Sequence, residues 1–239
     1  MTARPPIELD NILVIIPVRD EASTIAKVIN ALQSYNLNKI RVIDNGSRDG
    51  SGEIATQNNA EVIREEQPGY GQACWRGLQQ VPDSIEWFLF CDGDGSDDLS
   101  CLPQWFQLRE KYDFILGDRR ATTSGRSVMA PVQHFGNVLA TNLIAWGWGY
   151  RYYDLGPLRL IRRDKLEKIA MSDRGMGWTV EMQVRAIELK LRILELPVNY
   201  LPRQGGKSKI SGTIKGSIQA GTIILTTLAK LWFIKIFHQ

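Results

Sequence analysis

The sequence contains little of the chemistry that builds disulfide frameworks and structural metal clusters. It has only three cysteines (Cys74, Cys91 and Cys101) and two histidines among 239 residues. The cysteines are odd in number and lack the short regular spacing of zinc ligands. We therefore expect reduced thiols and a cytoplasmic protein, and we assign no role to either histidine.

Long hydrophobic runs are also missing. A membrane-spanning helix needs about 20 consecutive apolar residues, whereas the uncharged stretch Gly216–Ala229 has fourteen and ends at Lys230. Near the N-terminus, the apolar run Ile12–Val18 follows acidic residues and ends at Arg19. We accordingly expect neither a spanning helix nor a secretory signal peptide.

Acidic residues are absent after Glu195. The first 100 residues carry a net charge of −8, and the remainder carries +11. A basic C-terminal segment is typical of proteins that meet phosphates, nucleic acid or anionic membranes. No nucleic-acid recognition motif accompanies these cations, so we do not expect a nucleic-acid partner.

Short β-branched runs alternate with amphipathic segments along the first half. The composition is that of a globular protein, 44% hydrophobic and 23% charged. We predict strands over 11–18, 39–44, 60–65, 85–92 and 112–120, and helices over 19–35, 52–59 and 69–80. This alternation predicts an α/β fold with a mostly parallel sheet flanked by helices.

The second half has a less regular pattern. Residues 133–166 indicate a helix, an aromatic-rich turn and then a strand or loop around Asp154. A helix over 177–190 carries Glu181 near its start, and 191–203 reads as a last strand.

An unusual aspartate cluster, FLFCDGDGSDD, spans residues 88–98. Its aspartates directly follow a predicted buried strand, where like charges repel and desolvation is costly. Asp44 and the loop Arg19–Glu21 also follow predicted strands, and parallel strands place their carboxyl ends at one edge. An Asp-x-Asp pair suits Mg²⁺ or Mn²⁺, which usually shares its remaining ligand positions with substrate phosphates.

Several interpretations of the cluster compete. A calcium-binding EF-hand loop is excluded, because Asp97 and Pro103 occupy the positions that require Gly and Glu. A phosphatase of the haloacid-dehalogenase type would use Asp92 as its nucleophile, although about three predicted strands precede it. A nucleotide-sugar transferase would use the pair to hold a metal on the donor diphosphate. A solvated acidic turn needs no ligand.

Eight segments, in order, resemble family-two glycosyltransferases of the GT-A fold, in particular polyprenyl-phosphate sugar transferases of the dolichyl-phosphate mannose synthase type. They are IIPVRDEASTI, VIDNGSRDGS, GYGQACWRGL, CDGDGSDD, ILGDRR, DLGPLRLIRRD, GWTVEMQVRA and PRQGGKSKISG. Together they extend from about residue 12 to residue 212, most of the chain.

The resemblance implies roles for individual residues. On the donor side these are Pro17, Arg19, Glu21, Asp44, Gly71, Asp92 and Gly93. Asp94 would be the chief metal ligand, with Asp92 and Ser96 beside it. Arg119, Arg203 and Lys209 match positions that meet phosphates. Asp154 and Glu181 are candidates for a catalytic base or for binding sugar hydroxyls.

The implied activity is metal-dependent transfer of a sugar with inversion, from a UDP- or GDP-sugar to a lipid-linked acceptor such as a polyprenyl phosphate. The Gln-x-x-Arg-Trp motif of processive synthases is absent, so we expect a single sugar to be moved. The phosphatase, and a non-catalytic nucleotide-binding or membrane-docking protein, stay open as alternatives.

The C-terminal segment completes the predicted organisation. We expect a catalytic domain over 1–212 and an amphipathic helix over 213–239. Lysines and aromatic residues suit a helix at the inner face of a membrane, in contact with anionic lipid. Packing of this helix on the protein's own core is the alternative, and the oligomeric state is open.

Overall fold

The computed structural model describes residues 9–205 and 214–237. Seven strands form one sheet: β1 (Ile12–Val18), β2 (Ile40–Asp44), β3 (Glu61–Arg64), β4 (Trp87–Phe90), β5 (Phe114–Asp118), β6 (Arg159–Arg162) and β7 (Ile193–Pro197). The α-helices are α1 (Ile25–Ser34), α2 (Ser51–Gln57), α3 (Tyr70–Gly77), α4 (Leu102–Leu108), α5 (Thr123–Val128), α6 (Pro131–Trp148), α7 (Arg163–Ile169), α8 (Trp178–Glu188) and α9 (Ile214–Phe237).

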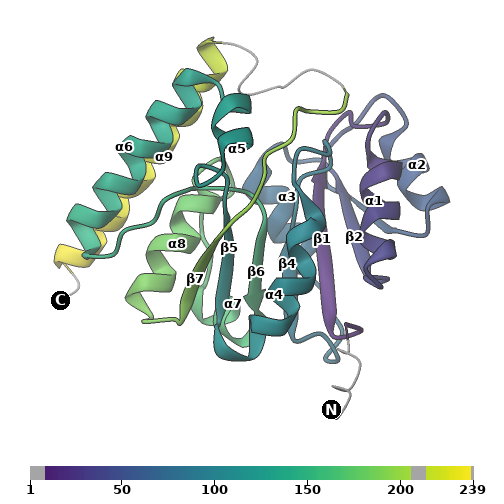
Figure 1. The fold of residues 1–239 in the computed structure, drawn as a ribbon, viewed down its shortest axis with the longest axis horizontal. Coiled ribbons are helices and arrows are strands. Elements are labelled where there is room, and N and C mark those ends of the chain that lie inside the picture. Colours follow the sequence, from purple (N-terminus) through teal and green to yellow (C-terminus); the bar gives the residue numbers. More distant parts are fainter. Residues whose placement is uncertain (1–8, 206–213, 238–239) are drawn as a thin grey trace.

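The sheet is mostly parallel, as predicted, with strand order β3-β2-β1-β4-β6-β5-β7. The exception is β6, which is antiparallel to both β4 and β5. Because β6 is reversed, β5 and β7 run in the same direction as β1 to β4. Six strands therefore end at one edge, and β6 begins there (Figure 1).

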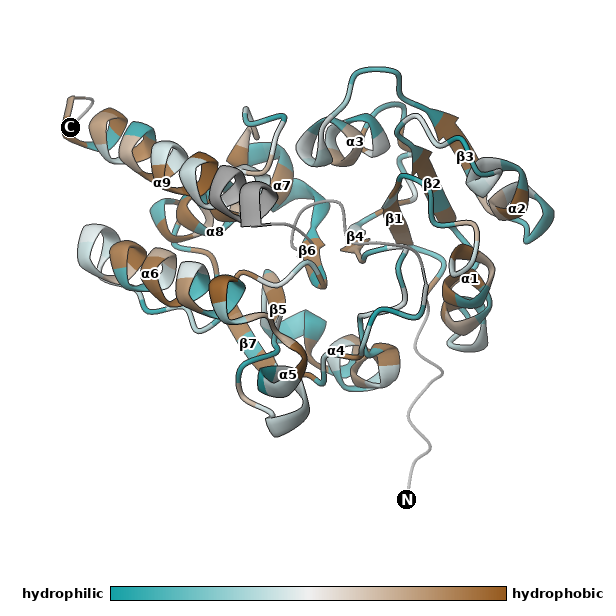
Figure 2. Ribbon diagram, turned by 90° about the horizontal axis from the view of Figure 1, so that it is seen from above, coloured by the Kyte–Doolittle hydropathy of each residue, from teal (hydrophilic) through white to brown (hydrophobic). Residues whose placement is uncertain are grey.

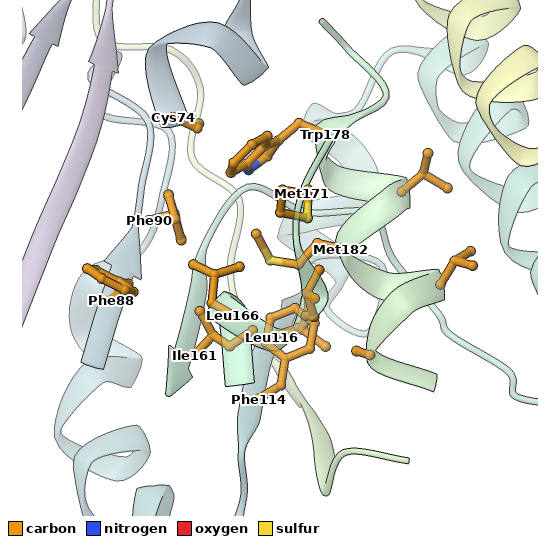
Figure 3. Close-up of a cluster of buried hydrophobic side chains, with 14 of the residues drawn as sticks. Cys74, Phe88, Phe90, Phe114, Leu116, Ile161, Leu166, Met171, Trp178 and Met182 are labelled. Carbon is orange, nitrogen blue, oxygen red and sulfur yellow. The ribbon is translucent and has the colours of Figure 1, made fainter. Parts of the chain in front are cut away.

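Helices cover both faces of the sheet and bury two apolar clusters. Residues of alternate parity along β1 divide between them, Leu13 and Ile15 on one face and Ile12 and Val14 on the other. The first cluster contains the edge-to-face pair Phe90–Trp178, with ring centroids 6.4 Å apart, which joins β4 to α8 (Figure 3). This packing holds the start of α8 against the end of β4.

Several boundaries differ from the predicted ones. The first helix begins at Ile25 and not at residue 19, because 19–24 form a loop in which the Thr24 hydroxyl donates to the Gly93 carbonyl at 2.8 Å. The last strand ends at Pro197, and 198–205 continue as a segment without strand pairing beyond one bridge, Asp97–Tyr200. Helices α4, α5 and α7 were not predicted.

The C-terminal helix α9 lies beside α6 and α8 (Figures 1 and 2). Its Leu228 and Leu231 are buried in the first apolar cluster. The division at residues 212 and 213 stays a prediction, since 206–213 lie outside the described residues. Nowhere in the described chain is a helix both long and apolar enough to cross a membrane.

Candidate active site

The carboxyl ends of the strands bring the predicted site residues to one edge. Arg19 follows β1, Asp92 follows β4, Arg119 follows β5, and Arg203 lies beyond β7. The reversed strand β6 contributes the loop that precedes it, which carries Asp154. Topology alone therefore assembles charged side chains that are far apart in the sequence.

A pocket of about 550 Å³ occupies this edge. The predicted residues that line it are Pro17, Arg19, Glu21, Asp92, Gly93, Asp94, Arg119 and Arg203. Another part of the lining is less polar: α6 and α9 contribute Val132, Gly136, Gly221 and Ile224 beside the polar Gln133 and Asn137, and Met129 lines it from just before α6. The pocket is thus lined by charged residues from the strand ends and by mostly uncharged residues from α6 and α9.

Hydrogen bonds within the aspartate loop hold its carboxylates in place. The Ser96 hydroxyl donates to Asp94 Oδ1 at 2.6 Å, and the Ser96 N–H donates to the same oxygen at 2.9 Å. The Asp92 N–H donates to Asp97 Oδ2 at 2.9 Å. Ser96 is buried and does not line the pocket, so in this structure it orients Asp94.

The loop concentrates negative charge in a poorly solvated place. Burial, together with the neighbouring carboxylates of Asp97 and Asp94, raises the pKa of Asp92 well above its usual range. Burial and Asp94 also raise the pKa of Asp97 to about 7. Both shifts mean that a positive charge placed here would be strongly stabilised.

Arg203 supplies one such charge. Its Nη1 lies 3.0 Å from Asp94 Oδ2, and its Nη2 donates to the Glu21 carboxylate. Its Nε donates to the Gly205 carbonyl at 2.8 Å, which fixes the guanidinium plane. The segment after β7 therefore folds over the aspartate loop and joins it to the loop after β1.

Arg119 forms a second cationic group, paired with Asp154. Its Nε and Nη2 donate to the two carboxylate oxygens at 2.7 and 2.9 Å, a bidentate ion pair. Burial would raise the pKa of Asp154, but the Arg119 charge outweighs it and holds that pKa below its usual value. Asp154 is fully enclosed, and Asn137 of α6 also donates to it.

The structure places the other predicted residues away from the pocket surface. The Glu181 carboxylate accepts from Ser172 Oγ at 2.6 Å and from the N–H groups of Ser172 and Asp173. Asp44 accepts from the Ser47 N–H at 2.8 Å at the end of β2. Gly71 packs so closely on the 173–175 loop that a Cβ would lie 2.8 Å from Gly175 O. Lys209 lies outside the described residues.

Three residues that sequence reasoning missed take part in the site. The centroid of the Tyr200 ring lies 4.9 Å from the guanidinium carbon of Arg119. Asn45 lines the pocket and holds the loop between β3 and α3, where it accepts from the Gly69 N–H at 2.9 Å. Asn45 directly follows the predicted Asp44, which is a usable signal, whereas nothing local marks Asn137 or Tyr200.

The donor set fits a divalent cation that substrate helps to bind. In the described part of the chain, no three His, Cys, Asp or Glu side chains could hold a metal by themselves. Asp92 and Asp94 nevertheless both line the pocket with oxygen ligands. Mg²⁺ and Mn²⁺ commonly take one or two protein carboxylates and complete their coordination with phosphate oxygens.

Comparisons with known proteins agree with this geometry. The family model described as "Glycosyl transferase family 2" matches residues 13–170. An uncharacterized glycosyltransferase of Mycobacterium tuberculosis is 32% identical over 218 residues, covering 88% of this chain and 94% of that protein. An undecaprenyl-phosphate mannosyltransferase of Micrococcus luteus is 29% identical, covering 86% and 89% respectively.

A solved structure shares the fold. Glucosyl-3-phosphoglycerate synthase from Mycobacterium tuberculosis, in complex with Mn²⁺, UDP-glucose and phosphoglyceric acid, superposes with a TM-score of 0.73 at 17% identity. The match covers 97% of this chain and 86% of that one. The GT-A fold predicted from the sequence is confirmed, and the chain belongs to glycosyl transferase family 2.

Proposed function

We propose that this glycosyltransferase moves a single sugar, with inversion, from a nucleoside-diphosphate sugar to a polyprenyl phosphate at a membrane surface. The observation that carries the proposal is the composition of the pocket. Carboxylates Asp92 and Asp94 and the cations Arg119 and Arg203 share it with an apolar wall from α6 and α9. A phosphate carried on an apolar chain matches both ends.

Asp92 and Asp94 would hold Mg²⁺ or Mn²⁺, and the cation would supply Lewis-acid stabilisation of the departing diphosphate. Pro17, Arg19 and Asn45 line the donor side of the same pocket. The donor residues predicted from the resemblance, including Asp44 and Gly71, stay predictions. UDP-glucose in the similar solved structure supports a UDP-sugar as the first donor to test.

The state of the candidate bases supports a phosphate acceptor. Asp154 is held in an ion pair with Arg119, and Glu181 accepts three hydrogen bonds from the 172–173 loop. A hydroxyl acceptor needs a base that can take its proton, whereas an anionic phosphate only needs to be positioned. The guanidinium of Arg119 lies over the ring of Tyr200, which helps to orient it. Arg119 is therefore the expected partner of the acceptor phosphate.

The test is transfer from a panel of UDP- and GDP-sugars with Mn²⁺ to undecaprenyl phosphate, followed by mass spectrometry of the lipid fraction. We expect one nucleotide class to give a glycosylated lipid. Phosphoglyceric acid serves as the competing acceptor, because it is bound in the similar solved structure. Transfer to phosphoglyceric acid and not to the lipid would contradict the proposed acceptor.

A thermal-unfolding series tests donor binding separately. A ligand at a hundred times its dissociation constant adds about 2.7 kcal/mol of stability. A Mn²⁺-dependent shift without turnover on any acceptor would support the non-catalytic alternative. The phosphatase alternative has no support in the family match and would require phosphate release from simple esters.

A further inference from the structure

Exposed apolar side chains are concentrated on two helices. Ten large hydrophobic side chains are exposed among the described residues, and eight of them belong to α6 or α9. The eight are Val132, Phe135, Trp146, Leu225, Trp232, Phe233, Ile236 and Phe237, which we call the α6/α9 face. An apolar cluster of this kind on an otherwise polar surface indicates an interaction site.

The two helices form one continuous surface. They run in the same direction, because Gly136 and Gly221 both line the pocket while Trp146 and Trp232 pack together at the far end, with tilted rings whose centroids are 4.8 Å apart. Lys235 Nζ donates to the Gly147 carbonyl at 2.7 Å and ties the ends together. Figures 1 and 2 show the pair side by side along one flank of the molecule.

Helix α9 is apolar on both of its sides. Leu228 and Leu231 point into the core, while Leu225, Trp232 and Ile236 recur at intervals of seven and four on the exposed side. A helix that is apolar all round belongs either in a core or against lipid. Since one side already packs on the protein, the other side has apolar surface left for a partner.

The charges around the α6/α9 face are positive, which favours an anionic partner. Neither α6 nor α9 contains an acidic residue. Lys230 is exposed on α9, and the exposed Arg126 and Arg151 flank the two ends of α6. Tryptophan and lysine together are typical of segments that lie at the bilayer interface, and anionic lipid attracts such cations.

We propose that the α6/α9 face docks on the surface of an anionic lipid bilayer, with its aromatic side chains inserted among the lipids. This rests on the proposed function, which places the acceptor's phosphate in water and its chain in a membrane. A second copy of the chain is a poorer occupant. A symmetric contact would place the same cations of both copies together without any acidic partner from these helices.

The position of the pocket agrees with docking at this face. Val132 is 43% exposed on the face and also lines the pocket, and Ile224 lines the pocket next to exposed Leu225. The apolar wall of the pocket therefore continues directly onto the face. A bilayer docked on the α6/α9 face would therefore lie next to the pocket.

The experiment is sedimentation of the full chain with phosphatidylcholine vesicles, with and without phosphatidylglycerol. The test variant is Phe135→Ser/Trp146→Ser/Phe233→Ser, whose side chains are 68%, 71% and 64% exposed, so the core is little affected. The control is Leu189→Ser, 42% exposed but outside the face. We expect binding to the anionic vesicles, about tenfold or more weaker in the triple variant and unchanged in the control.

Equal pelleting of the wild-type chain and the triple variant would overturn the proposal. A second result would also overturn it: the wild-type chain does not bind vesicles but forms a dimer, and the triple variant is a monomer, as measured by light scattering. A short, water-soluble prenyl phosphate separates the two proposals, because its glycosylation needs no membrane. Vesicle binding without such transfer would contradict the acceptor alone, and transfer without vesicle binding would contradict docking alone.

Discussion

At the scale of single residues, the site is a balance of charge around Asp94. Its carboxylate accepts from Ser96 and also pairs with Arg203, which in turn contacts Glu21. Arg203 thus pairs with one oxygen of the carboxylate that we propose as a metal ligand. If Asp94 holds a divalent cation as we propose, that cation would compete with Arg203 for the carboxylate, and a bound diphosphate would offer the guanidinium another anion.

This competition predicts that Arg203→Met binds Mn²⁺ more tightly than the wild-type chain when no nucleotide is present. Removing one direct ion pair should strengthen binding by roughly fivefold to tenfold, since such pairs contribute about 1 kcal/mol when partly exposed. Electron paramagnetic resonance of free Mn²⁺ measures the affinity. Weaker binding than in the wild-type chain would show that Arg203 supports the metal site and does not compete with it.

The Arg119–Asp154 pair makes a second prediction at this scale. Asp154→Leu leaves the Arg119 charge enclosed without its partner, which should lower the free energy of unfolding by about 3–5 kcal/mol. Urea denaturation measures the loss. The variant Asp164→Leu removes a carboxylate that pairs with Arg162 at the surface, and it should cost about 1 kcal/mol or less. Similar losses in the two variants would contradict the enclosed pair.

At the scale of elements, β7 is tied to the loop before β6 by Glu195. Its carboxylate accepts from the Tyr153 N–H at 3.0 Å and from the Asp154 N–H at 3.2 Å. Burial raises the pKa of Glu195 to about 7. At a pH between the pKa of Glu195 in the unfolded chain and its pKa in the folded chain, the unfolded chain releases the carboxyl proton while the folded chain keeps it. Glu195 therefore makes the free energy of unfolding fall as the pH rises through this window.

We therefore expect Glu195→Gln to lose less stability than the wild-type chain between pH 5 and 7, the window up to the folded pKa of about 7. Urea denaturation at several pH values across this window gives the two slopes. Identical slopes would mean that the Glu195 carboxyl does not hold its proton in the folded chain.

Helix α9 provides a further test at the same scale. Leu231 is 3% exposed and packs in the core, whereas Leu225 is 37% exposed on the outer side of the helix. Leu231→Ala should reduce the free energy of unfolding by about 2–4 kcal/mol, and Leu225→Ala by much less. Equal small effects would mean that α9 is a detached tail, as the division at residue 212 would allow.

At the scale of the whole molecule, the sequence predicts the layers better than the contacts between them. Five strands of the first half were expected because β-branched runs such as Ile12–Val18 are buried on both faces of a parallel sheet. The same apolar pattern does not encode strand direction, so the reversal of β6 was not foreseen. The sequence of 19–24 likewise did not indicate that these residues form a loop and that α1 begins only at Ile25.

In the site, too, the sequence indicates individual residues better than the contacts between them. Asp92 and Asp94 could be named from their own motif, and Arg119 and Arg203 from the family resemblance; all four line the pocket. Their partners could not be named, because Asn137 reaches Asp154 and Tyr200 reaches Arg119 only through the folded chain. The resemblance suggested Asp154 and Glu181 as a base or as binders of sugar hydroxyls, and the hydrogen bonds that occupy both carboxylates likewise arise only in the folded chain.

Mn²⁺-dependent sugar transfer by Asp94→Asn decides whether Asp94 acts as the proposed metal ligand. Asparagine keeps the size of the side chain but removes the charge that the metal would need, so we expect a loss of turnover of about a hundredfold or more. Asp98→Asn is the matched control, since Asp98 belongs to the same loop but does not line the pocket and bonds Ser100 and Asn199. Near-normal transfer by Asp94→Asn, at unchanged dependence on Mn²⁺, would mean that Asp94 is not a metal ligand and that the proposed mechanism is wrong.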